Sequence, residues 1–325
     1  MTPAPHDSRR KTLPRIPGLK PVIKDYKPRP APEGQTFAGE SVWIRYVNFV
    51  KLPHTLFALP FALLGVLYAS FETPVSVRHV GLVVLAFTAA RFAAMGFNRI
   101  ADRRFDALNP RTMGRELPRG ALTVRQASVA VVLASAVFVL SAALLNPLCF
   151  ALSPIALAWI LAYSYSKRFT SWSHLWLGMS LAMAPAGGYL AVAGMWSDPW
   201  WTLPVLAIGV LTWVAGFDMF YALPDEDFDR RQGLKSAVVL LGPRRAILVG
   251  KLLHAVTIAA LVGFGAGAQF GIAYYIGVAV AAGILVWEHQ LVRPDDLSRL
   301  NAAFFTMNGV MSIVVFLGAL VGRFL

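Results

Sequence analysis

Cysteine and charged residues are both scarce in this chain of 325 residues. The single cysteine, Cys149, excludes an internal disulfide, and its position in an apolar run predicts a packing role. Charged residues make up only 14% of the chain, hydrophobic residues make up 57%, and the mean hydropathy is +0.58. This composition excludes an ordinary soluble domain and predicts an integral membrane protein.

Several widespread site motifs are also missing. The sequence has no HExxH, CxxC, Walker A or glycine-rich dinucleotide fingerprint. Its first 40 residues hold eight prolines and eight Lys or Arg without an apolar core, so they do not resemble a signal peptide. We predict that residues 1–42 form a mobile, basic cytoplasmic tail and that residues 43–325 form one membrane domain.

Acidic residues are in deficit, with 17 Asp and Glu against 30 Lys and Arg and a net charge of +13. In a soluble protein such an excess of positive charge would suggest a nucleic-acid partner. In a membrane protein, cytoplasmic loops are enriched in Lys and Arg, which explains the same excess. We therefore expect membrane lipid as the surroundings and no nucleic acid as a partner.

Apolar runs separated by polar breaks predict nine membrane spans. If the N-terminus is placed in the cytoplasm and the spans alternate, the outside segments hold only Arg78 and Arg323, while Arg91 lies within a span. Such a bias predicts an all-α protein of the cytoplasmic (inner) membrane, with its N-terminus inside and its C-terminus outside. The predicted spans are 52–71, 79–97, 127–146, 147–164, 175–194, 201–220, 247–268, 271–291 and 302–322.

Two acidic clusters with the same spacing follow the second and sixth spans. The first is NRIADRRFD at 98–106, and the second is YALPDEDFD at 221–229. Each places two carboxylates four residues apart, with a polar residue four positions earlier, so three side chains share one helix face. Facing carboxylates are ligands for hard cations, and a magnesium ion held in this way usually carries a substrate phosphate.

Helical phase selects which residues belong with these clusters. Arg91 lies on the stripe of the first cluster, inside an apolar segment where an unpaired charge costs at least ~2.5 kcal/mol, so we expect it to face a site. Asp218 lies on the stripe of the second cluster, whereas Glu226 and Asp227 point elsewhere and should be solvated. Pro224 should bend or end the helix there.

Basic residues follow both clusters and complete a predicted phosphate site. Metal ions would bridge carboxylates to a diphosphate, and its remaining oxygens would need cations. Lys235 lies directly beyond the second cluster and is our first candidate for that contact. The other candidates are Arg103, Arg104, Arg111, Arg115, Arg230 and Arg231.

These motifs resemble those of the UbiA-type membrane prenyltransferase superfamily, which carries an NxxxDxxxD-like first motif and a YxxxDxxxD second motif. The resemblance extends to an arginine before the first motif, an acid before the second, GLKS at 233–236 and YSYSKR at 163–168. It covers the chain from about residue 43 to its end, and segments 51–60 and 109–118 are similar to the 4-hydroxybenzoate polyprenyltransferase-like branch. One departure is Arg99, where many relatives carry a second acid.

The resemblance implies nine transmembrane helices around a central cavity, with both Asp-rich motifs at its cytoplasmic mouth. It implies magnesium-dependent transfer of a polyprenyl group from polyprenyl diphosphate to an aromatic acid such as 4-hydroxybenzoate, in quinone biosynthesis. The implied catalytic residues are Asp102, Asp106, Asp225 and Asp229, which together with Asn98 would hold magnesium. The implied substrate-binding residues are Arg91, Asn98, Arg111, Asp218, Tyr221 and Lys235.

Two of these roles, and the acceptor, stay open at this point. Arg91 would bind either the acceptor's carboxylate or the diphosphate, and Tyr221 would either orient an acid or face the allylic cation. Part of the branch is thought to act in menaquinone synthesis on a dihydroxynaphthoate carboxylate, which is the alternative acceptor.

Two other classes of membrane protein fit the sequence less well. A CDP-alcohol phosphotransferase needs DGxxAR followed by GxxxDxxxD, and neither cluster supplies that pattern. A cation-coupled transporter would place ionisable residues near the bilayer midplane. Here the acids are predicted at the cytoplasmic ends of the spans, which favours the transferase.

Overall fold

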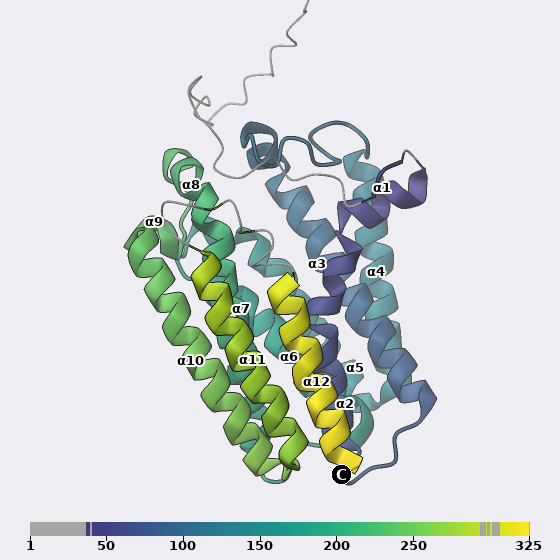
Figure 1. The fold of residues 1–325 in the computed structure, drawn as a ribbon. Helices are drawn as coiled ribbons and strands as arrows, with labels where there is room; N and C mark the ends of the chain where they lie inside the picture. The colour runs from purple at the N-terminus through teal and green to yellow at the C-terminus, as the bar shows by residue number, and fades with distance from the viewer. Residues whose placement is uncertain (1–36, 40, 293–296, 298–299, 301–305, 325) are drawn as a thin grey trace, which may run out of the picture.

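The computed structural model describes residues 37–39, 41–292, 297, 300 and 306–324, and this part of the chain is helical throughout its regular elements (Figure 1). The predicted tail at 1–42 lies almost wholly outside the described residues, so its role stays a prediction. The elements are α1 (Val42–Phe49), η1 (Leu52–Phe57), α2 (Leu59–Ala69), α3 (Val77–Leu108), α4 (Val124–Leu145), α5 (Pro147–Ala162), η2 (Tyr163–Arg168), α6 (Ser173–Ala193), α7 (Thr202–Ala222), η3 (Leu223–Asp225), α8 (Glu226–Gln232), α9 (Ala237–Leu241), α10 (Pro243–Gly267), α11 (Ile272–Leu291) and α12 (Asn308–Phe324).

Seven helical segments in the described chain are long and apolar enough to cross a membrane, which makes this an integral membrane protein. Two further apolar helices, α2 and α12, are shorter. The first predicted span, 52–71, is divided into η1 and α2 at Ala58, because Pro53 and Pro60 each lie at the start of a helical element. The left-handed backbone of Lys51 (φ 46°) separates η1 from α1. For the last predicted span, residues 301–305 lie outside the described part.

Helix α3 is longer than the apolar run that predicted it. The second span was expected to end at residue 97, but α3 continues to Leu108 and carries the whole first motif. The Arg, Asp and Ala residues of 99–107 are compatible with a helix, and Pro110 favours an extended conformation at Asn109, where the helix ends. Asn98, Asp102 and Asp106 are therefore on one continuous helix, as predicted.

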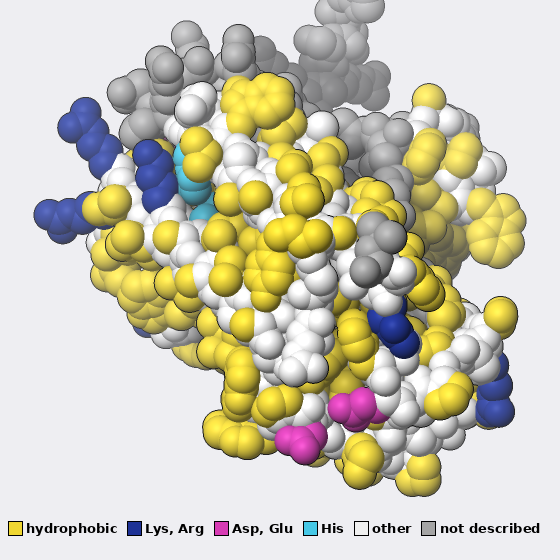
Figure 2. Space-filling view, turned by 60° about the horizontal axis from the view of Figure 1, so that its bottom comes forward, with side chains coloured by type: hydrophobic (Ala, Val, Ile, Leu, Met, Phe, Trp, Pro, Cys, Tyr) yellow, Lys and Arg dark blue, Asp and Glu magenta, His cyan; other side chains and the backbone are white. Residues whose placement is uncertain are grey.

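Helices α2, α6 and α7 form the centre of the bundle. Helix α7 packs between α6 and α10, α2 packs on α6, and the pairs α3–α4 and α11–α12 flank this centre (Figure 1). The core is built from large apolar side chains such as Phe61, Trp213 and Tyr189, all fully buried. Hydrophobic side chains also cover much of the end that Figure 2 turns forward, where charged groups are few.

The contact between α2 and α6 depends on two glycines. A Cβ at Gly65 would overlap the backbone carbonyl of Pro185, and a Cβ at Gly188 would overlap that of Ala62. Backbone atoms cannot move aside as a flexible side chain can, so the two helices approach this closely only with hydrogen at both positions.

We expect Gly65→Ala to destabilise the protein by about 1–3 kcal/mol, the usual cost of overpacking a core. Thermal unfolding in detergent, followed by loss of monodisperse protein, measures this effect. Gly81→Ala on α3 is the matched control, because a Cβ there meets nothing within 4 Å, and it should leave stability unchanged or raise it slightly. Equal stability of the two variants would contradict the close approach.

Candidate functional site

A cavity of about 690 Å³ runs through the bundle and brings both acidic motifs together. On α3 its lining extends from Val83 to Asp106, and on α6 it extends from His174 to Leu190. At about 1.5 Å per helical residue, the cavity is roughly 25–35 Å long. One end is lined by charged side chains and the remainder mainly by apolar ones such as Phe138 and Leu181. An amphiphile with a charged head and a long apolar tail matches this division.

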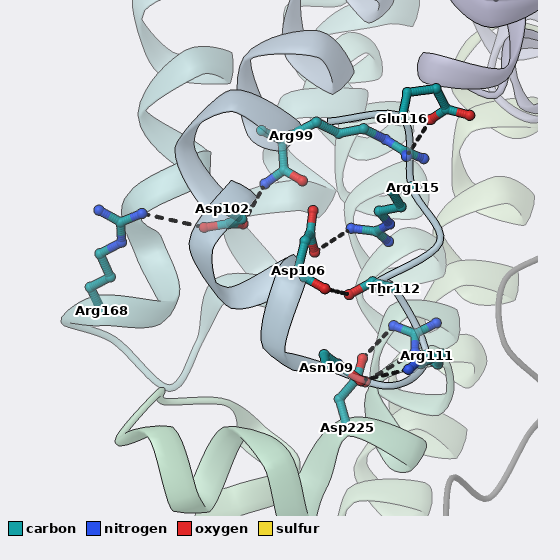
Figure 3. A network of polar contacts seen from close by, with 11 residues as sticks. Arg99, Asp102, Asp106, Asn109, Arg111, Thr112, Arg115, Glu116, Arg168 and Asp225 are labelled. Carbon is teal, nitrogen blue, oxygen red and sulfur yellow. Dashed lines mark hydrogen bonds and ion pairs between the residues drawn. The ribbon is translucent and has the colours of Figure 1, made fainter. Parts of the chain in front are cut away.

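The first motif is held by bases from other parts of the chain (Figure 3). Asn98 Nδ2 donates to Asp102 Oδ2 at 3.1 Å, and Arg168 Nη2 of η2 lies 3.3 Å from Asp102 Oδ1. Asp106 is buried, and its Oδ1 accepts from Arg115 Nη1 at 2.8 Å. In each of the two carboxylates of this motif, one oxygen is therefore paired with an arginine.

The second motif is buried more deeply. Asp225 accepts from both Nε and Nη2 of Arg111, and from Asn109 Nδ2 at 3.0 Å. Asp229, only 3% exposed, is paired with Lys167 Nζ at 2.9 Å. Pro224 ends α7 in the short turn η3 and α8 then starts, so both acids are kept on the cavity side of this break.

The loop that follows α3 connects the two motifs. Asn109 Oδ1 accepts from the backbone N–H of Arg111 at 2.9 Å, a local turn that sets the arginine toward Asp225. Further along, Glu116 is paired with Arg99 at 3.3 Å, and both side chains are buried (Figure 3). Arg99, which replaces an acid of many relatives, thus anchors this loop to α3.

The remaining predicted site residues divide into two groups. Arg91 lines the cavity and donates to the carbonyl of Val50 at 3.2 Å, and Tyr221 lies under the Arg111 guanidinium at 4.8 Å. Asp218 also lines the cavity and contacts the ring of His174. Lys235 lies apart, because it is exposed, is not among the described lining residues and donates to the carbonyl of Phe169.

Several residues at the charged end were not predicted as site residues. They are Asn109, Lys167, Arg168 and His174. Lys167 and Arg168 stood in the segment YSYSKR at 163–168, whose two adjacent bases at the end of an apolar run were the available signal. Asn109 begins the segment 109–118 that was quoted for the resemblance, whereas His174 carried no sequence signal, because its partner Asp218 is 44 residues away.

The carboxylate and amide oxygens of the two motifs are of the type that a divalent cation requires. Asp106 Oδ2 is buried and has no hydrogen-bond partner within the described residues, so one carboxylate oxygen is left for a ligand. Carboxylate and amide oxygens are the donors that Mg²⁺ prefers, and these residues fit such an ion. No three acids, histidines or cysteines of the described chain lie grouped as metal ligands in this arrangement, in which each motif carboxylate is paired with a base.

Comparisons with known proteins identify the family of this chain. The model of the UbiA prenyltransferase family matches residues 58–310. A 4-hydroxybenzoate octaprenyltransferase from Vibrio parahaemolyticus is 34% identical over 239 residues, which cover 73% of this chain and 82% of that protein. A protein of the same name from Edwardsiella ictaluri is 30% identical over 286 residues, covering 87% of this chain and 97% of its own length.

Solved structures show the same fold. The apo structure of a UbiA homolog from Aeropyrum pernix superposes with a TM-score of 0.76 at 33% identity, covering 83% of this chain and 98% of that one. A UbiA homolog from Archaeoglobus fulgidus, bound to GPP and Mg²⁺, has a TM-score of 0.63 at 18% identity, which supports the fold alone. The resemblance predicted from the motifs is confirmed, and the chain belongs to the UbiA prenyltransferase family, with 4-hydroxybenzoate octaprenyltransferases among its relatives.

Proposed function

We propose that this protein transfers a polyprenyl group from polyprenyl diphosphate to an aromatic acid, with 4-hydroxybenzoate as the first candidate acceptor, in quinone biosynthesis. The observation that carries the proposal is the cavity with both acidic motifs at its charged end and apolar walls along its length. The names of the curated relatives support the same reaction. The apolar walls would receive the isoprenoid tail, which water would otherwise exclude.

The charged end would bind the diphosphate. Asp102, Asp106, Asp225 and Asp229, with Asn98, would hold Mg²⁺, which supplies charge neutralisation at the leaving group. Each of these carboxylates is now paired with a basic side chain, so a metal ion can replace the base at the carboxylate while the base turns to a phosphate oxygen. Arg111 and Lys167 lie nearest the second motif for this role, and Lys235 stays a prediction. Positive groups fixed in advance around a leaving group are an effective source of catalysis.

The acceptor would lie below the diphosphate, beside the allylic carbon. Arg91 lines the cavity two helical turns from Asn98, where its guanidinium would bind an acceptor carboxylate or a diphosphate oxygen. Tyr221, already stacked with Arg111, would face the cation that forms when the C–O bond breaks, or orient the neighbouring acid. The electron-rich ring carbon beside the phenol would then attack that carbon.

The orientation in the membrane is part of the proposal. The short helices α2 and α12 would complete a set of nine spans together with the seven longer ones. The positive-inside bias supports a cytoplasmic charged end, an N-terminus inside and a C-terminus outside, in the inner membrane. The diphosphate would then enter from the cytoplasm while the tail reaches the cavity from the bilayer.

Membranes containing the protein, given a polyprenyl diphosphate and 4-hydroxybenzoate with Mg²⁺, are expected to form prenylated acid. Chelation of divalent ions should reduce the product to the background level, because the clustered carboxylates hold the diphosphate only through a metal. Mass spectrometry of extracted lipid measures the product, and added Mg²⁺ should restore it. Product formation unaffected by chelation would contradict the magnesium site.

The same assay separates the alternatives. A dihydroxynaphthoate acid offered beside 4-hydroxybenzoate tests the menaquinone acceptor, since only the preferred ring should give a high kcat/KM. A cation-coupled transporter would form no prenylated product with either acid. The four motif carboxylates and the bases paired with them lie at one end of the cavity, which favours the transferase.

A further inference from the structure

His174 forms a buried dyad with Asp218 beside the cavity. Its side chain lies in the first turn of α6, is only 1% exposed and contributes to the cavity wall. His174 Nδ1 is 2.7 Å from Asp218 Oδ2, which is contributed by α7. Neither residue belongs to the two Asp motifs, and the mechanism described so far gives His174 no role.

The second ring nitrogen of His174 lacks a partner. Nε2 is buried and has no hydrogen bond to any residue described in the structure. A carboxylate can only accept, so Asp218 fixes the proton of the neutral imidazole on Nδ1 and leaves the lone pair on Nε2. A buried nitrogen without a partner costs about 1–3 kcal/mol, a cost that a bound hydroxyl group would remove.

A second buried polar group of the cavity wall also lacks a hydrogen-bond partner. The hydroxyl of Ser164, in η2, is buried without a partner among the described residues, and Ser164 also lines the cavity. The elements η2 and α6 pack on each other. Two unsatisfied polar groups from adjoining elements of one cavity indicate a bound polar group rather than a packing defect.

The proposed reaction requires a proton acceptor that the other ionisable groups do not provide. A phenol attacks an allylic cation far better once its hydroxyl proton is withdrawn. The Arg and Lys side chains around the cavity can only donate, and the four motif carboxylates are each held by one of them. An imidazole that is oriented by a carboxylate is a common general base in enzymes.

We propose that His174 is the general base of the transfer reaction and that Asp218 is its positioning residue; the proposal rests on the function proposed above. Nε2 takes the phenol proton as the ring carbon bonds to the allylic carbon, and the electron pair of the broken C–O bond leaves with the diphosphate. The resulting dienone then loses its ring proton to water, and its oxygen regains a proton from His174. The net change is one new C–C bond, one diphosphate and one proton released.

The test compares His174→Gln with the wild type on two acceptors. Glutamine keeps a polar side chain of similar reach but cannot take the proton, so kcat should fall by about 10²–10⁴-fold with 4-hydroxybenzoate. With 3-fluoro-4-hydroxybenzoate, whose phenol is more acidic, the loss should be at least tenfold smaller. The KM for polyprenyl diphosphate should stay unchanged, and a folding defect is recognised because it would lower turnover by the same factor with both acceptors. Asp218→Asn should show the same dependence on acceptor acidity.

His79→Gln is the matched control, since this half-buried histidine caps the start of α3 and is not among the residues that line the cavity. It should keep the wild-type kcat. If His174→Gln keeps kcat within threefold of the wild type, or loses the same factor on both acceptors, the general-base role is overturned. Absence of product with the wild type itself would overturn the proposed function instead, so the two failures are distinguishable.

Discussion

Asp225→Asn is expected to lower kcat for prenyl transfer by at least about 10²–10³-fold, the loss seen when one preorganised electrostatic contact is removed from an active site. Asp225 is 6% exposed and receives three hydrogen bonds from Arg111 and Asn109. The amide keeps the shape of the side chain but removes the charge that a metal ion requires. Turnover by purified protein in detergent or nanodiscs, at saturating Mg²⁺ and donor, measures the loss.

Stability has to be followed in the same variant, because a buried Arg111 without its counter-ion is destabilising by about 3–5 kcal/mol. Asp227→Asn is the matched control, since Asp227 is two residues away and exposed, as predicted from helical phase. It should keep both stability and kcat. A fully active Asp225→Asn would remove the second motif from the metal site.

Lys167→Gln is expected to reduce kcat/KM for polyprenyl diphosphate by about 10²-fold, whereas Lys235→Gln should change it by less than about threefold. Lys167 lies in the cavity and is paired with the buried carboxylate of Asp229, so it is close to any phosphate bound there. Lys235 is exposed and donates to a backbone carbonyl. Steady-state kinetics with varied donor concentration measure both variants.

The two lysines test how the diphosphate is held. The effect at Lys167 should appear in the donor's kcat/KM and leave the KM of the acceptor unchanged, because a lysine that binds phosphate does not contact the acceptor. A larger loss at Lys235 than at Lys167 would mean that the segment 233–236 moves into the cavity when the donor binds. That result would support the role predicted for Lys235 from the sequence.

The helical architecture and the main site motifs could be predicted without coordinates. Apolar runs of about 20 residues have few alternatives to a membrane helix, because the bilayer leaves no partner for unpaired backbone groups. The spacing of Asn98, Asp102 and Asp106 likewise required only the helical period, and α3 carries them as predicted. Helical periodicity depends only on residues that are close together in the sequence, so it can be predicted from the sequence alone.

The ends of the elements were less predictable. Apolar content placed the end of the second span at residue 97, but α3 extends by a further eleven residues because charged residues continue a helix into water. The division of the first span into η1 and α2 depends on the proline near the start of each element and on packing against α3 and α6. Hydropathy does not record either of these effects.

The sequence by itself determined that this is a helical membrane protein with two carboxylate motifs, since composition and helical period are local properties. Only the tertiary structure decided which partners those carboxylates have. Arg111 and Asp225 are 114 residues apart, Lys167 and Asp229 are 62 apart, and His174 and Asp218 are 44 apart. Such pairs form because helix packing brings distant segments to one cavity, and no periodicity in the chain specifies which base will meet which acid.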